Sequence, residues 1–167
     1  YFLRLYGKYI APVAETYAYC LLRNHFHFAV RIKAPQEHGS FEEPCSYDPS
    51  KQFATFFGTY TKAINKAYKR TGTLFEGRFK RKPVENDQYL THLITYIHWN
   101  PAKHGFVDDY GDWPYSSYQA LISSKPTQLS RENVLGQFEG LENFQQFHRD
   151  GYDLETIAAL VEDDFGP

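Results

Sequence analysis

Apolar and polar positions alternate along two neighbouring segments near the start of the chain, which is the pattern of β-strands. Residues 15–22 and 25–33 are rich in aromatic and β-branched side chains, and a polar break of two residues separates them. Strands joined by so short a break form a tight antiparallel hairpin. Because successive side chains of a strand point to opposite faces, we expect His25 and His27 on one face and the phenylalanines beside them on the other, core-facing side.

Two amphipathic helices are predicted further along, because apolar residues recur every three or four positions over residues 52–70 and 87–100. We place the start of the first helix at Pro49 and its end at Gly72. The second helix should end or kink at its last residue, because Pro101 follows and the residue before a proline disfavours helical geometry.

The remaining segments carry weaker patterns. Residues 1–10 look like the end of a helix that stops at Gly7, and residues 34–50 are typical of a surface loop. A short aromatic and basic stretch over residues 73–84 predicts a strand or an extended loop. Residues 131–161 suggest two or three short acidic helices.

Composition narrows the class of protein. The chain has 167 residues, of which 42% are hydrophobic, with 14 Phe and 14 Tyr, enough for the core of one domain with or without an appendage. It holds no apolar run of about 18 residues, so we expect no membrane partner. With no secretion leader in view and only two cysteines, a cytoplasmic location is the default expectation.

The formal net charge of −2 conceals an asymmetry. Nine acids but only one basic residue lie between Glu132 and the end of the chain. Between residues 66 and 82 a single acid accompanies a run of basic residues, which comprises Lys66, Lys69, Arg70, Arg78, Lys80, Arg81 and Lys82. This basic stretch fits a polyanion such as nucleic acid, although two ordinary solvated faces would explain the same charges.

The second predicted helix carries two stripes of side chains. Four aliphatic residues between Leu90 and Ile97 fall within one narrow arc and form the buried stripe. His92, Tyr96 and Asn100 follow one another at intervals of four residues and form a polar stripe roughly 100° away. Tyr96 and Asn100 therefore share one side of a rigid scaffold. Taken alone, they would be a boundary tyrosine and a helix-end cap.

The polar stripe has a functional interpretation when it is considered together with the histidine pair. Two imidazoles about 7 Å apart along a strand can bind one metal ion, although such a pair is often incidental. With the amide oxygen of Asn100 as a third ligand, the donor set suits Mg²⁺ or Mn²⁺. A divalent ion polarises a phosphodiester, and a tyrosine such as Tyr96 attacks it to give a covalent phosphotyrosine.

In its order of motifs the chain resembles the HUH endonucleases, specifically the single-tyrosine transposases of the REP-associated branch. The resemblance covers about residues 13–120, and the combination is far more specific than a His-x-His pair. It is carried by the stretches Leu22–Phe28 (Leu-Arg-Asn-His-Phe-His-Phe), Gly72–Lys80, Tyr96–Pro101, Lys103–Gly105 and Trp113–Tyr118.

The resemblance implies an α+β fold, in which helices pack on one face of a small antiparallel sheet in a ferredoxin-like or RRM-like arrangement. It predicts a catalytic domain over residues 1–120 and a C-terminal acidic helical extension over residues 121–167. Relatives carry an initial strand and helix before the hairpin, so we expect that strand and roughly 20–30 residues to be missing here. Arg23 stands where relatives commonly have proline.

Position by position, the resemblance implies that His25, His27 and Asn100 bind the metal ion, Mg²⁺ or Mn²⁺. Tyr96 would be the nucleophile that forms a 5′-phosphotyrosine and leaves a 3′-hydroxyl. His92, one turn before Tyr96, is a candidate to orient it or accept its proton, although an exposed helix histidine is the simpler interpretation. The basic stretch would contact phosphates.

The function predicted is that of a transposase: a metal-dependent endonuclease and strand transferase on single-stranded, hairpin-bearing DNA, acting as a monomer or a homodimer. One alternative is a catalytically silent nucleic-acid-binding protein on the same fold, which would need the basic stretch but no metal site. Another is a metal-binding or regulatory protein without nucleic acid, which would leave the basic stretch unexplained.

Overall fold

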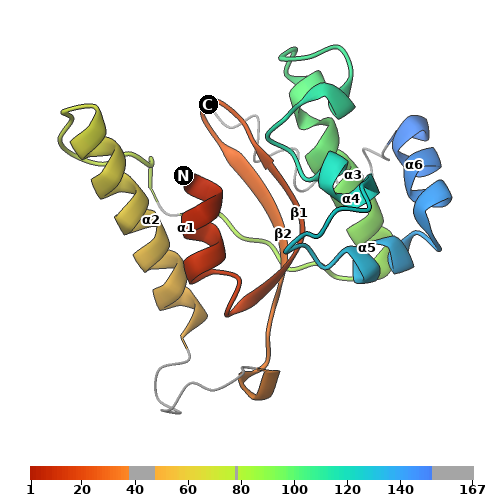
Figure 1. The fold of residues 1–167 in the computed structure, drawn as a ribbon, viewed down its shortest axis with the longest axis horizontal. Helices are drawn as coiled ribbons and strands as arrows, with labels where there is room; N and C mark the ends of the chain where they lie inside the picture. Colours follow the sequence, from red (N-terminus) through yellow and green to blue (C-terminus); the bar gives the residue numbers. More distant parts are fainter. Residues whose placement is uncertain (38–47, 78, 152–167) are drawn as a thin grey trace. The chain divides into compact units, whose positions relative to one another are not determined.

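The computed structural model describes residues 1–37, 48–77 and 79–151 (Figure 1). These residues form two compact units. Unit 1 comprises the described residues within 1–15 and 31–81, and unit 2 comprises those within 16–30 and 82–167. The predicted α+β class is confirmed, because the described residues form packed helices and a two-stranded antiparallel sheet. Within the described residues no helix is long and apolar enough to cross a membrane.

Unit 1 is built on two helices that pack through aromatic side chains, α1 (Phe2–Tyr9) and α2 (Pro49–Ala67). The ring of Phe2 lies 4.9 Å from that of Phe56 and 4.9 Å from that of Tyr60, centroid to centroid. Phe56 is only 1% exposed, so this aromatic contact is the centre of the unit's core. The aromatic residues that predicted the helix are therefore the ones that bury it.

The start of α2 agrees with the prediction from the sequence, and its end does not. The carboxylate of Asp48 accepts a hydrogen bond from the backbone N–H of Lys51, and a proline occupies the first turn, both as expected at a helix N-terminus. The helix ends at Ala67 rather than near Gly72, because Lys69 adopts a positive φ of 52° that breaks it earlier. The helix α1 likewise continues past Gly7 to Tyr9.

The predicted hairpin is present, with β1 at Ala14–Leu21 and β2 at Phe26–Ile32. The N–H of Leu22 donates to the carbonyl of His25 at 2.9 Å and closes the turn. On the other side of β1, the N–H of Ser117 donates to the carbonyl of Tyr19 at 2.9 Å. Both edges of β1 are thus hydrogen-bonded within unit 2.

The hairpin buries the face opposite to the one expected. In β2 only Ala29 is buried, at 3% exposure, and it lies on the histidine face, whereas Ile32 on the other face is 46% exposed. Ala18 and Cys20 of β1 are fully buried in the same core as the helix α3 (Asp87–Lys103). Small residues let a helix approach a sheet closely, so α3 packs on the histidine face, and the prediction of a phenylalanine core was wrong.

The helix α3 also runs further than predicted. It continues through Pro101 to Lys103 instead of ending at Asn100, and the N–H of His104 donates to the carbonyl of Asn100 at 3.0 Å to close its last turn. Proline removes one N–H from the ladder, which is tolerated so near the end of a helix. The stretch over residues 73–84 contains no helix or strand among its described residues.

The C-terminal helices share the core of unit 2. They are α4 (Tyr118–Ile122), α5 (Arg131–Gln137) and α6 (Leu141–Asp150), preceded by a short 3₁₀ turn, η3 (Tyr110–Asp112). Their buried side chains, including a fully buried Phe144, belong to the same cluster as α3. The predicted acidic helices are present to residue 150, and residues 152–161 of that prediction lie outside the described part. The division of the chain at residue 120 stays a prediction.

Candidate active site

The helix α3 supplies two of the predicted site residues, Tyr96 and Asn100, one turn apart. The amide nitrogen of the Asn100 side chain donates to the backbone carbonyl of Tyr96 at 2.9 Å, which fixes the orientation of the amide. Tyr96 is 1% exposed and Asn100 is fully buried. Tyr96 and Asn100 of the polar stripe therefore face the interior of unit 2 and not an open cleft.

The hairpin supplies His25 and His27 to the same place. The two imidazole rings lie 5.1 Å apart, centroid to centroid, and the ring of His27 lies 5.9 Å from the ring of Tyr96. The hairpin turn is anchored to the segment after α3, because the indole of Trp113 donates to the carbonyl of Leu21 at 2.9 Å. The structure thus brings the histidine pair and the tyrosine, about 70 residues apart in sequence, into one contacting group.

The neighbour of His25 in sequence determines which of its ring nitrogens is available. Nδ1 of His25 lies 2.8 Å from Oδ1 of Asn24. An amide oxygen only accepts hydrogen bonds, so Nδ1 carries the proton and, in the neutral ring, Nε2 carries the lone pair. Nε2 is buried and has no hydrogen-bond partner within the described chain. A histidine held in this way presents its ligand nitrogen to the interior.

The side chain of Asn100 supplies a second candidate ligand atom. Its Oδ1 is buried and also lacks a hydrogen-bond partner among the described residues. Leaving such an atom unpaired costs roughly 1–3 kcal/mol, so this oxygen and the Nε2 nitrogen of His25 are two buried atoms of unit 2 that a bound ligand could satisfy. No three His, Cys, Asp or Glu side chains of the described chain are placed to bind a metal together. A metal held by His25 and His27 therefore requires a ligand of another type, and Asn100 fits.

Burial keeps the site histidines in the neutral form that binds metals. Desolvation, with smaller contributions from the neighbouring His25, His104 and Lys103, lowers the pKa of His27 to about 3. Desolvation also lowers the pKa of His25, with His104 and Lys103 again adding to the effect. Neither ring needs to lose a proton at neutral pH before it can coordinate a cation.

Sequence reasoning missed two further residues at the end of α3. The imidazole of His104 lies 5.3 Å from that of His25, centroid to centroid. The ammonium of Lys103 donates to the hydroxyl of Tyr96 at 3.3 Å and lies 4.6 Å from the centre of its ring. Both residues belong to the Lys103–Gly105 motif, which was the available signal. The motif did not show where their side chains point, because the helix was not expected to continue past Pro101.

A second histidine pair lies on another side of α3 and is fully hydrogen-bonded. Nδ1 of His148 lies 2.8 Å from the carbonyl oxygen of Phe144, so Nδ1 carries the proton and Nε2 accepts. Nδ1 of His98 must then donate to that Nε2, at 2.8 Å, and Nε2 of His98 accepts from the hydroxyl of Ser117 at 2.7 Å. This closed chain ties α6, α3 and the start of α4 together.

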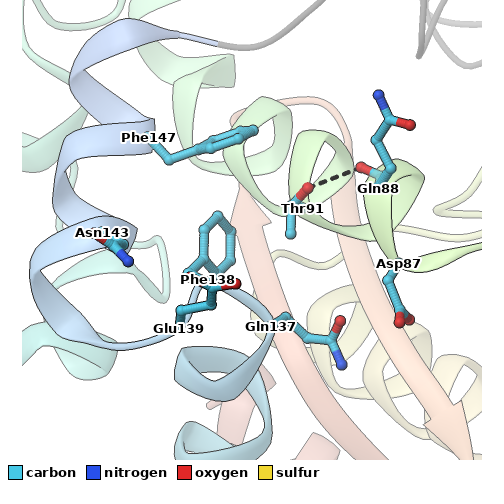
Figure 2. Close-up of a pocket in the computed structure, with 8 residues that line it drawn as sticks. All are labelled: Asp87, Gln88, Thr91, Gln137, Phe138, Glu139, Asn143 and Phe147. Carbon is cyan, nitrogen blue, oxygen red and sulfur yellow. Dashed lines mark hydrogen bonds between the residues drawn. The ribbon is translucent and has the colours of Figure 1, made fainter.

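His92 lies away from the group around Tyr96, at the border of a pocket. Its ring is 5.0 Å from that of Phe147, centroid to centroid. The pocket has a volume of about 360 Å³ and lies between the start of α3 and the α5–α6 corner (Figure 2). Two aromatic rings, polar side chains and two acids line it, without a lysine or arginine: Asp87, Gln88, Thr91, Gln137, Phe138, Glu139, Asn143 and Phe147. The lining therefore does not suit a phosphate.

The predicted DNA-contacting residues divide between the units. Lys82 precedes α3 in unit 2, and the others belong to unit 1. Arg78 lies outside the described residues. Exposed side chains make up the rest of the stretch, namely Lys66, Lys69, Arg70, Lys80, Arg81 and Lys82. Next to Lys80 in the sequence, the ring of Phe79 is 42% exposed and lies 5.4 Å from that of Phe57, so unit 1 carries an accessible aromatic ring within the basic stretch.

No family model matches the chain. A Haemophilus influenzae protein of the REP-associated tyrosine transposase type is 31% identical over 114 residues, which are 66% of this chain and 62% of the relative. The REP-associated tyrosine transposase of Escherichia coli K12 is 36% identical over 50 residues, 30% of either chain. The chain thus spans less than two thirds of the length of these curated relatives.

A solved structure supports the same relationship at the level of the fold. It is that of a REP-associated tyrosine transposase bound to a REP hairpin, and it superposes with a TM-score of 0.56 at 20% identity over 75% of this chain and 66% of that chain. In sequence and in fold, the chain is therefore related to the REP-associated tyrosine transposases, as its motifs predict.

Proposed function

We propose that the protein is a DNA transposase that cuts and rejoins single-stranded DNA through a covalent bond to Tyr96, and that it needs a divalent metal ion. The relatives support the class of enzyme. The observation that carries the mechanism is the contact between the rings of His27 and Tyr96, because it joins a candidate metal ligand to a candidate nucleophile inside one compact unit.

The proposed metal ligands are Nε2 of His25, an imidazole nitrogen of His27 and Oδ1 of Asn100, with Mg²⁺ or Mn²⁺ as the ion. The orphaned atoms of His25 and Asn100 support this set, since each is buried and each is a donor to cations. When bound, a divalent ion polarises a non-bridging oxygen of the scissile phosphate and lowers the repulsion that a nucleophile meets.

Residues of the chain perform the remaining tasks. Asn24 holds the ring of His25 in the tautomer that coordinates, and the backbone of α3 keeps Tyr96 one turn from Asn100. Tyr96 is 1% exposed, so the side chains over its hydroxyl must move aside when a strand enters. Attack by Tyr96 would join the tyrosine to the phosphate at the 5′ end of the downstream fragment and free a 3′-hydroxyl on the upstream fragment.

The DNA is proposed to be hairpin-bearing, as in the solved relative, which is bound to a REP hairpin. The exposed cations of the basic stretch would contact its phosphates, and Phe79 would stack on an unpaired base. Each phosphate contact makes affinity more salt-dependent, so binding should weaken steeply between about 50 and 200 mM salt.

The decisive test is covalent capture. Purified protein is mixed with a labelled single strand that carries a hairpin, with Mg²⁺, with Mn²⁺ or with chelator, and the protein–DNA adduct is counted on a denaturing gel. We expect an adduct with either ion, none with chelator and none for Tyr96→Phe, which should still bind the strand. The matched control is Tyr89→Phe, a tyrosine two turns earlier on α3.

An adduct formed by Tyr96→Phe would overturn the assignment of the nucleophile. Binding of the hairpin strand without any adduct, in the presence of either ion, would instead support a catalytically silent binding protein.

A further inference from the structure

We propose that Lys103 is a further catalytic residue of this site, which holds the Tyr96 oxygen beside the scissile phosphate and stabilises the charge that develops on both. The inference rests on the proposed function, because it assigns a role in the same reaction. It arises from the contact of the Lys103 ammonium with Tyr96. Neither the motifs nor the relatives assign a role to Lys103.

Lys103 touches Tyr96 in two ways. Its Nζ donates to the tyrosine hydroxyl at 3.3 Å, and the same nitrogen lies 4.6 Å from the centre of the aromatic ring. The two residues are seven positions apart, which is two turns of helix, so the long lysine side chain reaches back along α3 to the tyrosine. This geometry exists only because α3 continues through Pro101.

The position of the ammonium is also within electrostatic reach of the candidate metal ligands. Its charge contributes to the lowered pKa of His25, His27 and His104, after the larger effect of burial. Burial lowers the pKa of Lys103 itself. A partly desolvated cation exerts a stronger field than one in water, so its effect on a neighbouring oxygen is correspondingly larger.

An ammonium group is suited to bind both the tyrosine oxygen and a phosphate oxygen. It has three N–H donors, so it can bond the tyrosine oxygen and a phosphate oxygen at the same time. A hydrogen bond from a cation strengthens as its acceptor becomes negative, which occurs at the tyrosine oxygen during attack and again when the reaction reverses. Lys103 would therefore act in cleavage and in rejoining alike.

The step balances without a further reactant. A bond forms between the Tyr96 oxygen and phosphorus, and the bond from phosphorus to the 3′-oxygen breaks. The phenolic proton leaves to solvent, and the departing 3′-oxygen gains a proton from solvent. Lys103 keeps its proton throughout, and its role is to lower the barrier by binding negative charge as it forms.

Two substitutions separate this role from a structural one. Lys103→Met keeps the length of the side chain and removes the charge, and we expect the rate of adduct formation at saturating hairpin DNA to fall about 100-fold. DNA affinity should change less than about threefold, because one phosphate contact among many is lost. Lys103→Arg keeps a cation and should restore the rate to within about tenfold of wild type.

A matched control and a readout without DNA complete the experiment. Lys125→Met removes an exposed lysine of the same unit and should leave the rate unchanged. In protein labelled at the tyrosine Cζ carbon, the Tyr96 resonance, assigned with Tyr96→Phe, should move in Lys103→Met and stay in place in Lys125→Met.

The outcomes distinguish the two proposals. Wild-type protein that forms no adduct overturns the proposed function and the role of Lys103 with it. An active wild type with Lys103→Met within about threefold of its rate overturns Lys103 alone. A folded Lys103→Arg that is no faster than Lys103→Met also overturns it, because a cation at this position would then have no effect on the reaction.

Discussion

Two groups of histidines lie around the helix α3, and they differ in how their nitrogens are used. The core pair, His98 and His148, forms a closed chain in which each ring nitrogen has a hydrogen-bond partner. The hairpin pair, His25 and His27, is half-buried, and the buried Nε2 of His25 has no such partner in the described chain. Buried ring nitrogens occur in both groups, so the presence or absence of hydrogen-bond partners for these nitrogens separates a structural histidine from a candidate ligand.

The difference also predicts what each group contributes. Satisfied buried networks stabilise a fold and specify it, whereas buried atoms without partners cost stability and are retained at functional sites. We therefore expect substitutions in the core pair to act on stability and those in the hairpin pair to act on activity. Three experiments test this separation.

The largest effect is expected at the hairpin pair. His27→Ala removes a proposed metal ligand, and adduct formation should fall at least about 1000-fold, the equivalent of roughly 4 kcal/mol of transition-state stabilisation. The measurement is the gel assay for the covalent adduct, with circular dichroism to show that the fold is retained. Activity within tenfold of wild type would remove His27 from the metal site.

The next effect is expected at the core pair and concerns stability. His148→Ala opens a cavity and leaves Nδ1 of His98 without its acceptor, so the free energy of unfolding should fall by about 3 kcal/mol. Urea titration followed by circular dichroism measures it. At a temperature where the variant is folded, its adduct formation per folded molecule should stay within a few-fold of wild type. A variant that is stable but inactive would contradict the division between the two groups.

The smallest effect is the dependence of stability on pH. Burial, partly opposed by the hydrogen bond to Phe144, lowers the pKa of His148 to about 4, whereas an unfolded histidine titrates near 6.5. Between these values the unfolded state binds a proton that the folded state does not, so stability falls as pH falls through this window and is unaffected above it. From pH 7 to pH 5 the contribution of His148 should be about 2 kcal/mol.

The control for this measurement is His148→Gln, which lacks the titrating group but can still accept a hydrogen bond. Its loss of stability between pH 7 and pH 5, measured by urea titration, should be smaller than that of wild type by the same amount. Equal losses in the two proteins would mean that His148 does not resist protonation in the fold.

The local patterns of the sequence were sufficient for the hairpin and for the existence of both long helices, since strand alternation and helical periodicity are properties of short segments. They were insufficient for the ends of helices. The helix α3 passes through Pro101 because a missing N–H matters little in a last turn, and α2 stops before Gly72 because Lys69 leaves helical geometry. Where a helix ends depends on a few hydrogen bonds, and the alternative ways of making them differ little in free energy.

For the candidate site, the sequence by itself determined which residue types were present and at what spacing: a histidine pair on one face of a strand, and a tyrosine and an asparagine one turn apart. Only the tertiary structure decided which face of the hairpin α3 covers. Two alternating faces of a strand are equivalent until a partner packs on one, and here Ala18, Cys20 and Ala29 admit the helix on the histidine face. That packing brings His27 to Tyr96, and the extra turn beyond Pro101 brings Lys103 to the same hydroxyl.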